Sequence, residues 1–253
     1  MDLKLFLPDS DTENVYHARD ERIELKFILT PELKDQVASW AKQYMRPDPH
    51  CTATRGDSYE INTLYLDTAA QDIFHKTPPL GNTKYRLRRY AAEQTVWLES
   101  KFKQNNLVQK NRSAIPLAQL HCVKHPLSAG DHWPGEWFRN RVFQYDLQPS
   151  ALVHYQRFAR TSCYQDQIIR LTIDSKITGQ QTSNWEIPPG CDASPSLLPD
   201  EQVLELKFHH TLPPLFKRLL LDIPLISTGF SKYRTALSSE ITQTGLRNRA
   251  DSI

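Results

Sequence analysis

The chain has 253 residues, enough for one large domain or two small ones with a sizeable buried core. Its 31 Lys and Arg nearly balance its 29 Asp and Glu, and a net charge of +2 argues against a general nucleic-acid binder. Any polyanion site must therefore come from local segregation of charge. No apolar run approaches the roughly 18 residues of a membrane span. Four widely spaced cysteines without a CxxC pair indicate free thiols and a reducing, cytoplasmic compartment.

The first elements follow a polar stretch over residues 1–20, which we expect to be a loose leader. Residues 22–28 alternate between charged and apolar side chains, and this alternation predicts a strand. Thr30 offers an N-cap and Pro31 a first-turn proline, so a helix is expected from there to before Pro47.

The middle of the chain predicts a hairpin of two strands flanked by shorter elements. In chain order we expect a strand over 60–67, a short helix over 69–75, a turn over 78–82, strands over 83–90 and 96–103, and mostly helical or irregular chain over 104–150, with a helix over 136–145.

Strands resume in the last part of the chain. The expected elements are strands over 152–160 and 168–174, a weak strand around Trp185, a loop over 188–199, a strand over 203–208, a helix over 213–221 and a last short helix opened by residues 231–234. The chain thus has about seven or eight strands, most with one apolar and one charged face. This pattern fits a single antiparallel sheet with a solvated face, or a closed barrel with its polar face inward and helices outside.

The charged faces of these strands are mainly basic. The strand over 83–90 places Lys84, Arg86 and Arg88 on one face with no acid among them, so acids on other strands or a bound polyanion must face it. On all such faces the cations are Arg22, Lys26, Lys84, Arg86, Arg88, Lys101, Lys103, Arg157, Arg170 and Lys207, and the acids are Glu24, Glu99, Asp174 and Glu205. Any one of these strands fits a solvated surface. Six strands with the same basic excess favour a tunnel or groove that binds a polyanion, and arginine suits phosphate because its planar fork bonds two oxygens.

The few acids on these faces have two possible roles. Glu24, Glu99 and Glu205 can be counter-ions to the cations, or ligands of Mg²⁺ or Mn²⁺, which prefer hard oxygen donors. His121, His125 and His132 lie close in sequence without paired zinc spacing, which favours loop histidines. The chain has no P-loop, no GxSxG motif and no dinucleotide-binding fingerprint.

Eight short segments resemble, in order and spacing, the catalytic domain of the vacuolar transporter chaperone (VTC) family, within the triphosphate tunnel metalloenzyme superfamily. They are residues 24–27 (ELKF), 63–67 (TLYLD), 86–90 (RLRRY), 97–101 (WLESK), 155–159 (YQRFA), 170–174 (RLTID), 204–207 (LELK) and 230–233 (FSKY). The resemblance implies an α+β fold, an eight-stranded antiparallel β-barrel that forms a triphosphate tunnel with helices packed outside. It implies a tunnel domain over 21–240 and a C-terminal tail over 241–253.

The resemblance also implies a metal-dependent polyphosphate polymerase that transfers the γ-phosphoryl group of ATP to a growing polyphosphate chain, with Mn²⁺ or Mg²⁺. The implied residues divide into catalytic cations (Arg86, Arg88, Lys101, Arg157 and Lys232), further phosphate contacts (Lys26, Lys84, Tyr155, Arg170 and Ser231) and metal ligands (Glu205, with Glu24 and Glu99 as further candidates).

Two alternatives stay open at this point. The chain could be a tunnel triphosphatase that hydrolyses inorganic triphosphate or a nucleoside triphosphate, or a non-catalytic polyphosphate-binding module. Tunnel hydrolases often present a pair of glutamates on the first strand, and the single Glu24 here favours transfer over hydrolysis. The expected partners are ATP and polyphosphate or triphosphate, without nucleic acid and without a membrane span.

Overall fold

The computed structural model describes residues 22–51, 56–104, 107–125, 133–190 and 194–238, and the expected leader and C-terminal tail lie outside these ranges. The elements are β1 (Arg22–Leu29), α1 (Pro31–Tyr44), β2 (Arg46–Pro47), β3 (Ser58–Asp67), α2 (Asp72–His75), β4 (Thr83–Tyr90), β5 (Thr95–Gln104), β6 (Leu107–Pro116), the 3₁₀ helix η1 (Leu117–Val123), α3 (Glu136–Gln144), β7 (Gln148–Tyr164), β8 (Gln167–Gln181), β9 (Gln202–His209) and α4 (Pro214–Asp222).

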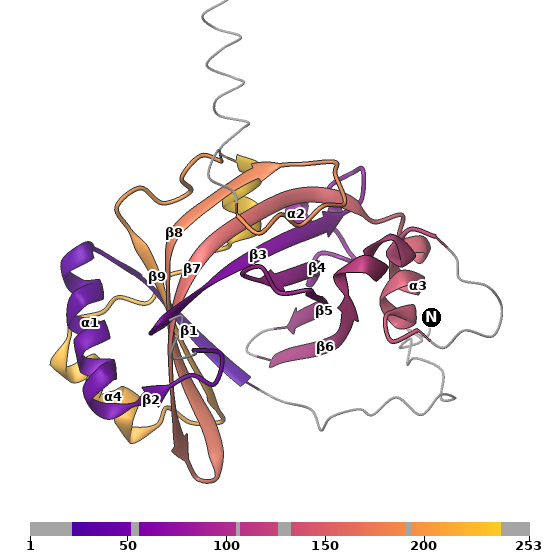
Figure 1. Ribbon diagram of the computed structural model, residues 1–253. Coiled ribbons are helices and arrows are strands. Elements are labelled where there is room, and N and C mark those ends of the chain that lie inside the picture. Colours follow the sequence, from indigo (N-terminus) through magenta and orange to yellow (C-terminus); the bar gives the residue numbers. More distant parts are fainter. Residues whose placement is uncertain (1–21, 52–55, 105–106, 126–132, 191–193, 239–253) are drawn as a thin grey trace, which may run out of the picture.

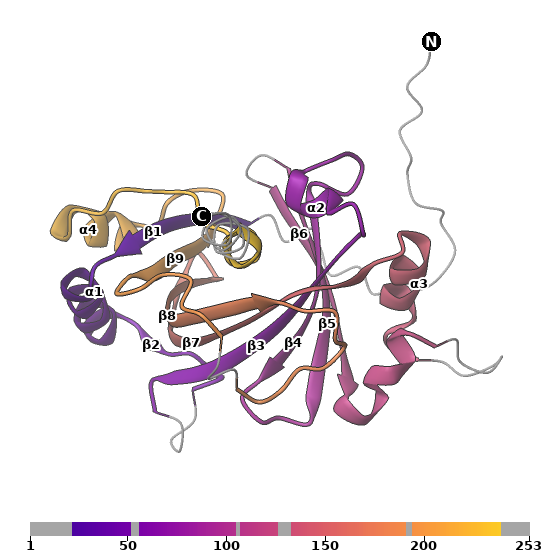
Figure 2. The same cartoon turned by 90° about the horizontal axis from the view of Figure 1, so that it is seen from above.

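The strands form one antiparallel sheet in the order β1-β9-β8-β7-β3-β4-β5-β6, and the two-residue β2 pairs with β7. The sheet curls strongly, with helices on its outside (Figures 1 and 2). The predicted eight-stranded antiparallel fold with outer helices is confirmed. In the described strands the curl is a half-barrel, because the hydrogen-bonded path runs from β1 to β6 without closing into a ring.

The register of the sheet puts the charged positions of neighbouring strands on the same face. Arg86 of β4 lies opposite Tyr65 of β3 and Glu99 of β5, and Glu99 lies opposite Arg112 of β6. Directly opposed residues of an antiparallel pair point to the same side, so these side chains share one surface. This surface is the concave one, which we call the lumen.

The apolar positions point outward, under the helices. Leu204 and Leu206 of β9 are fully buried in a core that also contains Val37 of α1 and Phe216 of α4. A second core packs Leu98 of β5 and its neighbours against residues of η1 and α3. Burying one such side chain contributes roughly 1.5–3 kcal/mol, so the outer faces hold the curl together.

Two expected elements differ in the structure. The segment predicted to be mostly helical or irregular after residue 104 contains the ten-residue strand β6. Among the described strands β6 pairs with β5 alone, so its outer positions, such as Asn111, stay exposed and polar, and the alternation is lost. The weak strand around Trp185 is wrong: residues 182–188 are irregular, and Trp185 packs against the core from a loop.

The predicted last helix is present over residues 232–238. The chain before it is tied to β1, because Thr228 donates its N–H to the Lys26 carbonyl. Figure 2 shows this helix, in gold, between β9 and α2 on the open side of the curl. Among the helices of the described ranges, none is long and apolar enough to cross a membrane.

Candidate functional site

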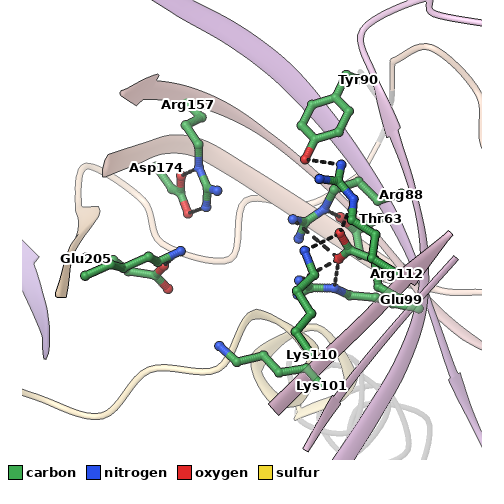
Figure 3. A network of polar contacts seen from close by, with 12 residues as sticks. Thr63, Arg88, Tyr90, Glu99, Lys101, Lys110, Arg112, Arg157, Asp174 and Glu205 are labelled. Carbon is green, nitrogen blue, oxygen red and sulfur yellow. Dashed lines mark hydrogen bonds and ion pairs between the residues drawn. The ribbon is translucent and has the colours of Figure 1, made fainter. Parts of the chain in front are cut away.

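The first cluster of the lumen surrounds Glu99, whose side chain is fully buried (0% exposed). Nε and Nη2 of Arg86 both lie 2.7 Å from its Oε2, and Nη1 of Arg88 lies 3.7 Å from the same oxygen. Nζ of Lys110 and Nε of Arg112 lie 2.6 Å and 3.3 Å from its Oε1 (Figure 3). Burial favours the neutral acid, but Arg86 and Arg88 outweigh it and hold the pKa of Glu99 well below its usual range. The acid expected opposite the basic strand is therefore Glu99, and this one carboxylate faces four cations.

Sequence reasoning missed Lys110 and Arg112, because β6 was not recognised as a strand. Their spacing of two residues, the same as that of Arg86 and Arg88, is the signal that was available. The Arg112 guanidinium stacks 3.4 Å from the Trp97 ring centre and donates a 3.2 Å hydrogen bond to the Tyr90 hydroxyl. Burial, with repulsion from nearby arginines, lowers the pKa of Lys110 to about 7 despite Glu99.

The second cluster is centred on Asp174 of β8, which is 0% exposed. Arg157 of β7 donates two hydrogen bonds of 2.6 and 2.7 Å to the two carboxylate oxygens, and Lys232 donates a third of 2.6 Å. Burial opposes ionisation, but Arg157 and Lys232 outweigh it and lower the pKa of Asp174 to about 2. The ring of Tyr155 lies beside both cations, 5.2 Å from the Arg157 guanidinium carbon and 4.7 Å from Lys232 Nζ.

The third cluster lies on β1 and β9 and reaches across the lumen. Glu205 is 2.9 Å from Lys207 and 3.3 Å from Lys26. Glu24 of β1 accepts a 2.6 Å hydrogen bond from Lys101 of β5, so this pair joins opposite parts of the curl. Burial opposes ionisation of Glu24, but Lys207 and Lys101 outweigh it and lower its pKa to about 2, while burial lowers the pKa of Lys101 to about 8.

Lys84 of β4 contacts a hydroxyl in the lumen instead of a carboxylate. Its Nζ donates a 2.8 Å hydrogen bond to the Ser231 hydroxyl, and among the residues that the structure describes it has no carboxylate within ion-pair distance. Burial, with repulsion from Lys26, Lys101 and other cations, holds its pKa well below the usual value. A bound anion would relieve this repulsion.

Three predicted cations fall outside these clusters. Arg170 of β8 has other partners, because its Nε lies 2.8 Å from Asp48 and its Nη2 donates a 2.7 Å hydrogen bond to the Tyr59 hydroxyl. Lys103 is exposed at the end of β5, and the side chain of Arg22 lies outside the described part of the chain.

A family model of the VTC domain matches residues 21–241. The chain belongs to the VTC domain family. No curated protein matches the chain in sequence.

Several solved structures match this VTC domain at low identity. A protein of Hippeastrum, described as a candidate adenylyl cyclase with a dominant triphosphatase activity, is 15% identical, with a TM-score of 0.49, over 86% of this chain and 95% of its own. A protein of Bacillus halodurans, described as a candidate adenylate cyclase, is 12% identical, with a TM-score of 0.48, over 83% and 94%. A protein of Pyrococcus horikoshii is 10% identical, with a TM-score of 0.47, over 87% and 99%.

The carboxylates of this VTC domain differ in their fitness as metal ligands. Glu24 and Glu205 face the same part of the lumen, close enough for Glu205 to raise the pKa of Glu24, and the cations around them keep both ionised. Ionised carboxylates are the hard donors that Mg²⁺ and Mn²⁺ prefer, so these two residues fit such an ion. The described residues contain no gathered group of three or more His, Cys, Asp or Glu, so an ion there would need further ligands from phosphate and water. Glu99 is enclosed by four cations and is better suited to be a counter-ion.

Proposed function

We propose that this VTC domain is a metal-dependent polyphosphate polymerase that transfers the γ-phosphoryl group of ATP to a growing polyphosphate chain. The observation that carries the proposal is the excess of cations over carboxylates among the described residues of the lumen. Four cations share Glu99, and Lys84 has no carboxylate partner in the described ranges. A linear polyphosphate presents a row of negative charges, and the cations of β1, β4, β5, β6, β7 and β9 line a curled surface along which such a row can bind.

The proposed roles follow from the chemistry of each side chain. Arg86, Arg88 and Arg157 have buried guanidinium groups, whose contacts with carboxylates can be exchanged for hydrogen bonds to phosphate oxygens. Lys101 and Lys232 supply point charges at the transferred group. Lys26, Lys84, Tyr155, Arg170 and Ser231 are proposed as further phosphate contacts along the lumen and its rim.

The reaction needs positioning and charge neutralisation more than acid–base chemistry. An oxygen of the terminal phosphate of the acceptor forms a bond to the γ-phosphorus, the bond from that phosphorus to the β-phosphate oxygen breaks, and ADP leaves with the bonding electrons. The acceptor oxygen is already ionised, so no base has to remove a proton. The buried cations stabilise the charge that develops on the leaving oxygen.

Glu24 and Glu205 are proposed to hold a Mn²⁺ or Mg²⁺ ion. Such an ion, when bound with the nucleotide, would neutralise charge on the phosphate oxygens. The protein's own part is to keep both carboxylates ionised, which the lysines beside them achieve. Glu24 is the one glutamate of β1, the strand on which tunnel hydrolases often present a pair, and this favours transfer over hydrolysis.

Incubation with ATP and Mn²⁺, followed by a gel for polymer and an assay for free phosphate, tests the proposal. Polymer is the expected product. Release of phosphate without polymer would contradict the polymerase and indicate a triphosphatase. Binding of triphosphate without either product would leave a polyphosphate-binding module. ATP and polyphosphate as partners and a cytoplasmic location are part of the same proposal.

A further inference from the structure

The chain around Lys232 is attached to five separate elements by five successive residues. In order, these contacts are Lys26 Nζ of β1 to the Phe230 carbonyl (3.0 Å), Lys84 Nζ of β4 to Ser231 Oγ (2.8 Å), Lys232 Nζ to Asp174 of β8 (2.6 Å), the Tyr233 hydroxyl to Asp67 of β3, and Arg234 Nη2 to the Phe74 carbonyl of α2 (3.1 Å). We call residues 230–234 the strap. Ser231 and Lys232 contact a cation and an acid of the lumen, Lys84 and Asp174, whereas Tyr233 and Arg234 contact the end of β3 and α2.

Asp67 is the most firmly held partner of the strap. Its carboxylate is 1% exposed and accepts N–H hydrogen bonds from Thr68 (2.8 Å), Ile73 (2.9 Å) and Phe74 (2.9 Å). These bonds join the end of β3 to the first turn of α2, so the carboxylate cannot move without disturbing both elements. The Tyr233 hydroxyl donates to Oδ2 of this carboxylate and also meets Ser150 Oγ at 3.1 Å.

Tyr233 is itself 1% exposed, and its ring packs 5.2 Å from that of Tyr65. Burial, with the hydrogen bond to Asp67, raises the pKa of its phenol, so the hydroxyl stays a donor. The Tyr233 hydroxyl meets the Asp67 carboxylate one residue along the chain from Lys232, whose ammonium group binds Asp174.

We infer that Asp67 and Tyr233 are positioning residues, which set the place of Lys232 and Ser231 in the lumen and thereby set the affinity for phosphate without touching it. This inference rests on the proposed function, because it assumes that Lys232 contacts phosphate. A phosphate ligand must compete with Asp174 for the ammonium group of Lys232. A small displacement of the strap changes the distance between this ammonium group and the phosphate, and therefore the outcome of the competition. A buried hydrogen bond between a phenol and a carboxylate fixes that distance in a way that ring packing alone does not.

The test is a double-mutant cycle with Tyr233→Phe, Lys232→Ala and the double variant, with inorganic tripolyphosphate as the ligand in metal-free calorimetry. Tyr233→Phe should weaken binding about fivefold, and it should have no further effect once Lys232 is alanine, because the two residues then act through one contact. With ATP as substrate, Tyr233→Phe should raise KM more than it lowers kcat. Tyr145→Phe, which removes a phenol from the outer side of the sheet, is the matched control and should bind as wild type does.

Three results would overturn the inference. Tyr233→Phe could bind tripolyphosphate as wild type does, or it could weaken binding by the same factor with and without Lys232, as a general loss of order would. If Tyr233→Phe does not fold, Asp67→Asn takes its place in the cycle, and failure of both to fold would make the pair structural only. A wild-type chain that does not bind tripolyphosphate would instead remove the proposed function, and the inference with it.

Discussion

At the scale of single residues, a substitution of Glu205 tests whether this side chain is a metal ligand or a counter-ion. Glu205→Gln keeps the size of the side chain and removes its charge. If the residue holds the ion, metal-dependent turnover should fall about 100-fold or more, because charge stabilisation in the transition state is lost. Metal-free affinity for tripolyphosphate should stay or increase, because one repelling anion has gone.

The matched control is Glu201→Gln, which changes an exposed glutamate just before β9. The metal-dependent turnover and the metal-free affinity for tripolyphosphate of this variant should both match those of wild type. Near-normal turnover of Glu205→Gln would remove Glu205 from the metal site and leave Glu24 as the candidate ligand.

Arg86 and Arg88 give a second test at this scale, because they share a strand face but differ in their partners. Arg86 places two nitrogens 2.7 Å from Glu99, whereas Arg88 lies 3.7 Å away and donates a 3.3 Å hydrogen bond to the Thr63 hydroxyl. Arg86→Ala should lower the free energy of unfolding by about 2 kcal/mol, the usual contribution of hydrogen bonds to a charged group, and by more than Arg88→Ala does. Both variants should weaken tripolyphosphate binding.

Thermal melting and calorimetry on the two variants measure these quantities side by side. Equal destabilisation would mean that distance to Glu99 does not decide which arginine is structural. Unchanged binding in both variants would exclude the face of β4 from the phosphate site.

At the scale of elements, we expect the lysines of β6 and β5 to make phosphate binding dependent on pH. The pKa of Lys110 is lowered to about 7, and that of Lys101 on the neighbouring β5 to about 8. These lysines lose their charge as the pH rises through 7 to 8, and a bound anion favours the charged form. Tripolyphosphate binding at pH 8 should therefore take up protons, and affinity should fall between pH 7 and pH 9.

Calorimetry in buffers of different ionisation enthalpy measures the proton uptake directly. Lys110→Gln should reduce the uptake at pH 8, while Lys103→Gln, at an exposed position of β5, serves as the control. Proton release on binding, or no exchange at all, would contradict the lowered lysine pKa values.

At the scale of the whole molecule, the lumen should bind phosphate through many charges at once. Affinity for tripolyphosphate should fall steeply as salt is raised from about 0.05 to 0.5 M, because screening weakens each cation–phosphate contact. The melting temperature of the free protein, measured over the same range, controls for unfolding. An affinity that does not depend on salt would count against a binding surface built from several cations.

The sequence by itself determined the strands with clean alternation and the face on which their cations lie. Residues 22–28, 83–90, 96–103 and 203–208 all lie in strands, and their alternation puts Lys26, Arg86, Glu99 and Glu205 on the lumen face, because a period of two leaves no other arrangement once the apolar face is buried. It also determined the N-cap at Thr30, whose hydroxyl accepts the Leu33 N–H, since capping is local chemistry.

The tertiary structure alone decided which charges meet. Glu99 joins four cations from β4 and β6, and Glu24 reaches Lys101 across the lumen, because register and curl bring together strands that are far apart in sequence. The sequence analysis did not predict the edge strand β6 for a related reason. Its sequence does not alternate clearly, and pairing with β5 is what stabilises it as a strand. The contact between Asp67 and Tyr233 spans 166 positions of the chain, and such a contact exists only once the sheet has folded around the strap.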